Sequence, residues 1–219
     1  MVSLQGILNL DMSYPGIHIK VEVIVLKEYL SHMEAGVAAS CSSYIASEER
    51  NLSGLEYDEY SHIYRIAEDE IPRIIRMPML VSIYTLFENS VTQLLEYTQK
   101  KENKALGLKD ITAKSLPSKF NKYIEHVLGF DFVFDQKTMS ALSEITKLRN
   151  CVAHANGNLG SLELSKANAI KRIAAKENSI LIVSNQLDIS YEYLRESMDI
   201  VESSLRKLMA YIEKRYGYY

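Results

Sequence analysis

The chain has 219 residues, of which 47% are apolar and 24% are charged, values typical of a globular protein that buries a core. This composition excludes an intrinsically disordered or collagen-like chain. Its 25 Lys and Arg against 28 Asp and Glu give a formal charge of −3 at pH 7. That balance argues against a protein that coats nucleic acid with a broad positive field, but it leaves room for a local basic site.

The sequence also bears on where the protein resides. No apolar run approaches the roughly 20 residues that a membrane-spanning helix needs. The first twenty residues lack a basic stretch followed by an apolar one, so we expect no secretory signal. Cys41 and Cys151 are too few for a disulfide framework, which fits a reducing compartment. We therefore expect a cytoplasmic protein without a membrane span.

Helix breakers are scarce, with 4 Pro and 9 Gly, so long helices are expected throughout. The first element is ambiguous, because apolar and polar residues alternate over 17–23 as in a strand, but residues 20–50 as a whole favour a helix. A second helical region is predicted over residues 58–103, and Pro72 and Pro78 are expected to kink or restart it. Arg76 and Glu88 in this region are expected to support the structure as an ion pair.

The second half of the chain predicts shorter elements and one long final helix. Helices are expected at residues 119–128, 136–155 and 164–175, and a small β-hairpin at 179–190. The final helix begins near Ser190 and repeats apolar residues at spacings of three and four, the pattern of a bundle seam, at Leu194, Met198, Val201, Leu205, Leu208 and Ile212.

These elements predict an all-α fold: a helical bundle with long kinked helices and a small β-hairpin before the last helix. No repeat, low-complexity segment or linker divides the chain. We therefore predict a single domain over residues 1–219, with residues 1–19 as an N-terminal extension and residues 179–190 as a hairpin insertion.

Several sequence patterns for catalysis are missing. The chain has no phosphate-binding loop, two-histidine zinc helix, Cys-x-x-Cys pair or Gly-x-Ser-x-Gly elbow. Its five histidines are scattered singly, so we expect no metal site and no cofactor.

One segment, residues 148–157, combines residues that can carry chemistry. At about 100° per residue, Leu148 and Val152 lie on the face that the chain buries, whereas Asn150 and His154 lie on the far side and Arg149 lies at the border. Histidine has an unperturbed pKa near neutrality and suits general acid–base catalysis. Arginine offers a charged fork that matches phosphate oxygens. The combination suits metal-free RNA cleavage, in which the 2′-hydroxyl attacks the adjacent phosphate.

One copy supplies a single such histidine, and an ideal helix separates Arg149 and His154 by about 140°. A twofold pairing of two such helices, which brings two Arg and two His into one cleft, makes better chemical sense. By spacing alone, a surface Arg–His pair without function is the commoner explanation.

Arg149-Asn150, three residues and then His154, at the end of a helix, resembles the Arg-polar-x-x-x-His motif of the HEPN superfamily. The order of the predicted helices over residues 71–215 is similar as well. The resemblance implies an all-α bundle that dimerises around a composite site. It also implies a metal-independent endoribonuclease that acts as a toxin, a phage-defence effector or an RNA-processing enzyme.

By this resemblance, His154 would be the general base or acid, Arg149 would bind the scissile phosphate, and Asn150 would position both. The partners would be an RNA substrate, a second copy and an antitoxin or defence-system protein. HEPN toxins with nucleotidyltransferase antitoxins usually carry Tyr two residues after the His, where this chain has Asn156, so that form of regulation is not expected. Local basic and polar residues give the candidate RNA contacts: Lys147, Asn156, Lys119, Lys122, Lys171 and Arg172.

Two alternatives stay open at this point. Some HEPN proteins are non-catalytic scaffolds or nucleotide-binding modules, and this chain would then bind without cleaving RNA. The third possibility is a plain helical bundle in which the motif is a coincidence.

Overall fold

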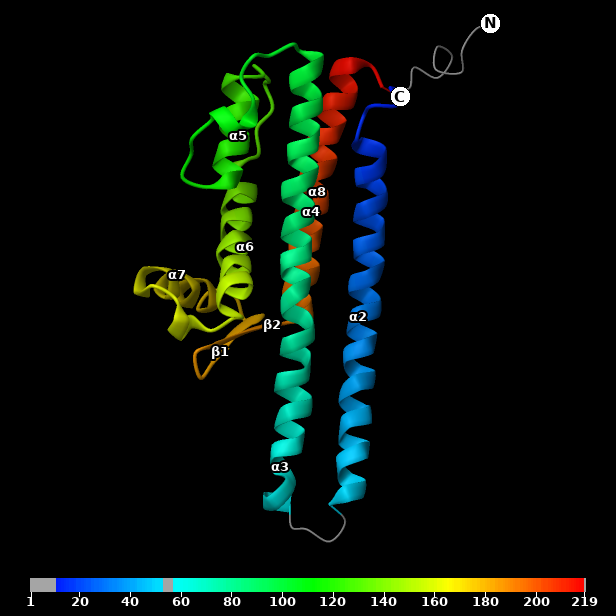
Figure 1. The fold of residues 1–219 in the computed structure, drawn as a ribbon, viewed down its shortest axis with the longest axis vertical. Helices are drawn as coiled ribbons and strands as arrows, with labels where there is room; N and C mark the ends of the chain where they lie inside the picture. Colours follow the sequence, from blue (N-terminus) through cyan, green and yellow to red (C-terminus); the bar gives the residue numbers. More distant parts are fainter. Residues whose placement is uncertain (1–10, 53–56, 219) are drawn as a thin grey trace, which may run out of the picture. The chain divides into compact units, whose positions relative to one another are not determined.

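The computed structural model describes residues 11–52 and 57–218, which form an all-α fold with a small antiparallel hairpin (Figure 1). No helix in this part of the chain is long and apolar enough to cross a membrane. In chain order, the elements are α2 (Gly16–Asn51), α3 (Tyr57–Arg65), the π-helix η1 (Ile66–Glu70), α4 (Ile71–Lys101), the 3₁₀-helix η2 (Leu108–Asp110), α5 (Leu116–His126), α6 (Gln136–Ala155), the 3₁₀-helix η3 (Leu159–Ser161), α7 (Leu164–Ala174), β1 (Ile180–Val183), β2 (Gln186–Ile189) and α8 (Tyr191–Tyr216).

The all-α prediction is confirmed, as is the hairpin directly before the last helix. Helix α6 has the predicted bounds, and α2 resolves the ambiguous first element as a helix. Helix α2 begins at Gly16, inside the range predicted as an N-terminal extension, and residues 1–10 of that range lie outside the described part.

The two prolines lie at different places in this helical region. Helix α4 runs through Pro78, so this residue does not end it. Pro72 is the second residue of α4 and directly follows η1, from which the helical backbone continues without a break, because the N–H of Ile71 still donates to the carbonyl of Ile66. The irregularity lies upstream, where the π-helix η1 separates α3 from α4.

The chain forms two compact units, each assembled from separate segments. The first contains the described residues of 1–24, 83–146 and 197–219, and the second contains those of 25–82 and 147–196. The single domain over residues 1–219 stays a prediction.

The first unit has an aromatic core. The ring of Phe87 in α4 lies 5.9 Å from that of Phe120 in α5 and 6.0 Å from that of Phe134, measured between centroids. Tyr216 and Tyr218, near the end of the chain, pack against Tyr97 of α4. The heptad residues that α8 contributes to this unit are completely buried: Met198, Val201, Leu205, Leu208 and Ile212.

The second unit contains the hairpin, whose strands pair with Ile180 opposite Ile189 and Val183 opposite Gln186. Ser184 and Asn185 connect the strands, and both have positive φ angles, of 50° and 65°. Two such residues give a type I′ turn, whose twist matches that of the strands. In Figure 1 the hairpin lies beside the C-terminal end of α6, so it is placed to support the motif helix.

Arg76 of α4 pairs with Glu34 of α2 within the second unit, and not with Glu88 as expected. The Arg76 Nε donates to the Glu34 Oε2 at 3.0 Å, and Nη2 donates to the other carboxylate oxygen. Arg76 and Glu88 lie twelve residues apart in α4, about 18 Å along the axis, so they cannot meet. The bidentate pair with Glu34 joins the middle of α2 to the N-terminal part of α4 instead.

Candidate functional site

Helix α6 places the three motif residues as the helical spacing predicts. Leu148 is completely buried and Val152 is 9% exposed, so this face of the helix belongs to the core. Asn150 and His154 are exposed, one turn apart, and Arg149 is half-buried. The motif therefore lies on an accessible surface of the second unit, where a large substrate can reach it.

Arg149 and Asn150 contact each other directly. The Nη1 of Arg149 donates a hydrogen bond to the Oδ1 of Asn150 at 3.0 Å. This bond restricts the guanidinium to one region of the surface beside the exposed face of α6. The hydrogen bond thus holds the Asn150 amide against the Arg149 guanidinium.

The end of the motif helix is held by the hairpin. Asn156 and Gly157 both have left-handed backbone conformations, with φ of 48° and 76°, which end the helix just after His154. The carbonyl of Gly157 accepts a hydrogen bond from the N–H of Leu187 in β2 at 2.9 Å, and the N–H of Leu159 donates to the carbonyl of Asn185 at 2.8 Å. These bonds fix the helix end one turn from His154.

Gly157→Ala is expected to destabilise the protein by about 1–3 kcal/mol. A Cβ at this position would lie 2.7 Å from the Met77 Sδ, on a backbone with φ of +76° that alanine tolerates poorly. The matched control is Gly36→Ala, in the middle of α2, where a Cβ meets nothing within 4 Å and alanine is the better helix former. The measurement is thermal unfolding followed by circular dichroism. Equal melting temperatures for the two variants would contradict the prediction.

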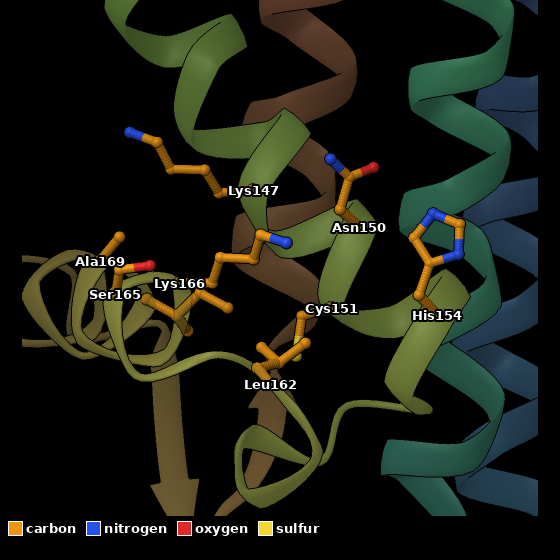
Figure 2. A pocket seen from close by; sticks show the side chains of 9 residues that line it. Lys147, Asn150, Cys151, His154, Leu162, Ser165, Lys166 and Ala169 are labelled. Atoms are coloured by element: carbon orange, nitrogen blue, oxygen red, sulfur yellow. The ribbon is translucent and has the colours of Figure 1, made fainter.

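A pocket of about 550 Å³ lies between the motif face of α6 and the α7 segment (Figure 2). Helix α6 contributes Lys147, Asn150, Cys151 and His154. The facing wall comes from the segment that enters and forms α7: Leu162, Ser165, Lys166, Ala169 and Ile170. Two of the three motif residues, Asn150 and His154, therefore line a cavity large enough for a small organic ligand.

Cys151 lies on the floor of this pocket with 1% of its surface exposed. Burial raises the pKa of the Cys151 thiol to about 11, because the thiolate loses its hydration. The thiol is therefore protonated at neutral pH and acts as a small apolar group, not as a nucleophile.

The predicted RNA contacts divide between the two units. Lys147 lines the pocket, whereas Lys171 and Arg172 are exposed on α7 and Asn156 is exposed at the end of α6. Lys119 and Lys122 belong to α5 in the first unit, where the Nζ of Lys122 donates to the carbonyl of Thr112 at 3.2 Å. Of the six predicted RNA contacts, Lys147 alone lines the pocket together with Asn150 and His154.

Sequence reasoning missed the α7 wall of the pocket. Lys166, Ala169 and Ile170 lie at spacings of three and four, as expected for one face of a helix, whereas Leu162 lies in the extended segment before α7. That signal shows a shared face, but it does not show that the face lies opposite His154.

No protein-family model matches the chain, and no curated protein or solved structure is significantly similar to it. Across residues 11–52 and 57–218, no group of three or more His, Cys, Asp or Glu is arranged to hold a metal ion. The chemistry of the pocket and the motif therefore carries the functional argument.

Proposed function

We propose that the protein is an endoribonuclease of the HEPN type, which cuts RNA without a metal ion by attack of the 2′-hydroxyl on the adjacent phosphate. One observation carries the proposal. Asn150 and His154 lie exposed on consecutive turns of α6 and line a pocket, with Arg149 hydrogen-bonded to Asn150. A proton-transfer group and a phosphate-binding group thus share one accessible surface.

In the proposed reaction, His154 takes the proton of the 2′-hydroxyl as this oxygen attacks phosphorus. The O2′–P bond forms and the P–O5′ bond breaks, and the leaving O5′ receives a proton from a general acid. The products are a 2′,3′-cyclic phosphate and a 5′-hydroxyl. The Arg149 guanidinium binds the phosphate oxygens and stabilises the charge that develops on them.

A second copy of the chain completes the site in this proposal. The reaction needs both a base and an acid, and each chain offers one motif histidine. Asn150 and His154 face away from the core of their own unit, where a twofold-related α6 can approach them. The two His154 side chains would then serve as base and acid in one cleft.

A mixing experiment tests this composite site. We expect an about ninefold excess of inactive His154→Ala subunits to lower the activity per wild-type subunit about tenfold, because most wild-type chains then sit in mixed dimers that lack one histidine. Cleavage is measured before and after subunit exchange, which native mass spectrometry verifies. Unchanged activity after verified exchange would mean that each subunit works alone.

The direct test of the function is the cleavage of an end-labelled single-stranded RNA in the presence of EDTA. The proposal expects cyclic phosphate ends on the 5′ fragments and hydroxyl ends on the 3′ fragments. A requirement for a divalent metal, or ends of another type, would contradict it. At the cellular level, the same chemistry would serve a toxin or a phage-defence effector with an antitoxin or defence-system partner.

The pocket itself favours a second candidate function, a non-catalytic module that binds a nucleotide. Its volume of about 550 Å³ falls in the range of small-ligand sites. Such a module would bind nucleotides and leave every RNA intact.

A further inference from the structure

We propose that the pocket between α6 and α7 binds one unstacked nucleotide of the RNA, next to the phosphate that is cut, and so selects the cleavage position. The inference rests on the proposed function, because it places this nucleotide beside the motif. Phosphate binding by Arg149 and proton transfer by His154 do not require a cavity. The inference therefore goes further, because it assigns a base-binding site to the pocket.

The floor of the pocket is apolar and suits the face of a base. Cys151 and Ile170 are buried, with 1% and 2% of their surfaces exposed, and Leu162 and Ala169 complete the apolar wall. Burial keeps the Cys151 thiol neutral, so no charge interrupts this floor. A planar, weakly hydrated base gains more from such a surface than a bare ion or a sugar does.

The rim of the pocket is basic and polar. Of the described residues that line it, none is acidic and two are lysines, Lys147 and Lys166. In Figure 2 the side chain of Lys166 extends from α7 toward α6. Its Nζ lies 3.2 Å from the Glu163 Oε1, but both side chains are mostly exposed, so a phosphate can replace this weak ion pair. An anionic ligand with an apolar part matches this arrangement, and a nucleotide has both.

The pocket and the motif share Asn150 and His154. A nucleotide seated in the pocket therefore has its sugar and phosphate within the region that these two side chains reach. The exposed hydroxyl of Ser165 and the Asn150 amide provide hydrogen-bonding groups for the edge of the base. The bound base would thus set which phosphate lies at His154 and Arg149.

Direct binding tests the pocket without requiring catalysis. Isothermal titration with the four nucleoside 3′-monophosphates uses the intact protein, and inorganic phosphate alone is the control for a simple anion site. We expect at least one nucleotide to bind about tenfold or more tightly than phosphate. Ala169→Phe fills the pocket and should weaken that binding about tenfold or more, whereas Ala175→Phe, an exposed position at the end of α7 outside the lining, should not.

A second variant tests the pocket independently, in case Ala169→Phe does not fold. Lys147 and Lys166 are exposed, so their replacement by Gln leaves the core intact. The double variant Lys147→Gln, Lys166→Gln should lose nucleotide affinity and keep its circular dichroism spectrum. Nucleotide binding that is unchanged in both the filled and the double variant would overturn the pocket proposal.

Cleavage of a randomised RNA library separates this inference from the proposed function. The wild type is expected to cut with a marked preference at one position flanking the broken bond, and Ala169→Phe to lose that preference. If the wild type and Ala169→Phe both cleave without a base preference, the proposal of a base-binding pocket is wrong, but the proposed nuclease activity is not contradicted. If nucleotides bind in the pocket but no RNA is cleaved, the proposed nuclease activity is wrong, but the proposed nucleotide binding is not contradicted.

Discussion

His154→Ala is expected to lower RNA cleavage about 10²–10⁴-fold, because it removes the side chain that transfers the proton of the 2′-hydroxyl. His154 is exposed on α6, so its loss leaves no cavity in the core. The melting temperature and the helical circular dichroism signal should therefore stay at the wild-type values. The measurement is the single-turnover rate on an end-labelled RNA, taken alongside thermal unfolding of the same preparation.

The matched control is His32→Ala, since His32 is also exposed on a helix of the second unit but does not line the pocket. This variant should cleave at the wild-type rate. If both histidine variants cleave as the wild type does, the motif histidine is not the proton-transfer group. If both lose activity equally, the effect is not specific to the motif, and the assignment fails as well.

The sequence predicted the fold well where one periodicity dominates. In α8 the spacing of apolar residues predicted a single buried seam, and its six heptad residues from Leu194 to Ile212 are each 0% exposed. In α6 the same geometry predicted which side chains turn inward, because Leu148 and Val152 are buried while His154 is exposed. Local spacing suffices in these helices because each buries one continuous stripe.

The beginning of α2 shows why other elements were ambiguous. Ile19 and Val23 are buried, whereas Ile17, Val21 and Val25 are 50–60% exposed. Apolar residues therefore occupy both faces of this helix, and their alternation imitates a strand. The tertiary fold decided the element, and the sequence pattern alone did not contain that information.

The candidate site was predictable only in part, for a similar reason. The motif residues follow from one helix, and the structure gives them the expected exposure. The pocket beside them depends on α7 lying opposite α6, a contact between segments that no periodicity encodes. The Arg76–Glu34 pair is another example, since its partners lie on different helices 42 residues apart in sequence.

Arg149→Ala is expected to lower kcat about 10²–10³-fold, because it removes the cation that stabilises the phosphate in the transition state. KM should change less, since the substrate phosphate carries less charge before the attack than during it. The kinetic constants are measured at saturating and limiting RNA. A variant with an unchanged kcat would reject this role for Arg149.

Arg149→Lys tests whether the positive charge at this position is sufficient for catalysis or whether the planar guanidinium is also needed. Lysine keeps the positive charge but has no planar fork, so it cannot hold the Asn150 Oδ1 and two phosphate oxygens in one fixed arrangement. We therefore expect Arg149→Lys to recover only part of the activity that Arg149→Ala loses. Arg65→Lys, at an exposed arginine of α3 that does not line the pocket, is the control and should behave as the wild type. Full activity in Arg149→Lys would mean that a point charge suffices, and the Arg149–Asn150 hydrogen bond would then have no catalytic purpose.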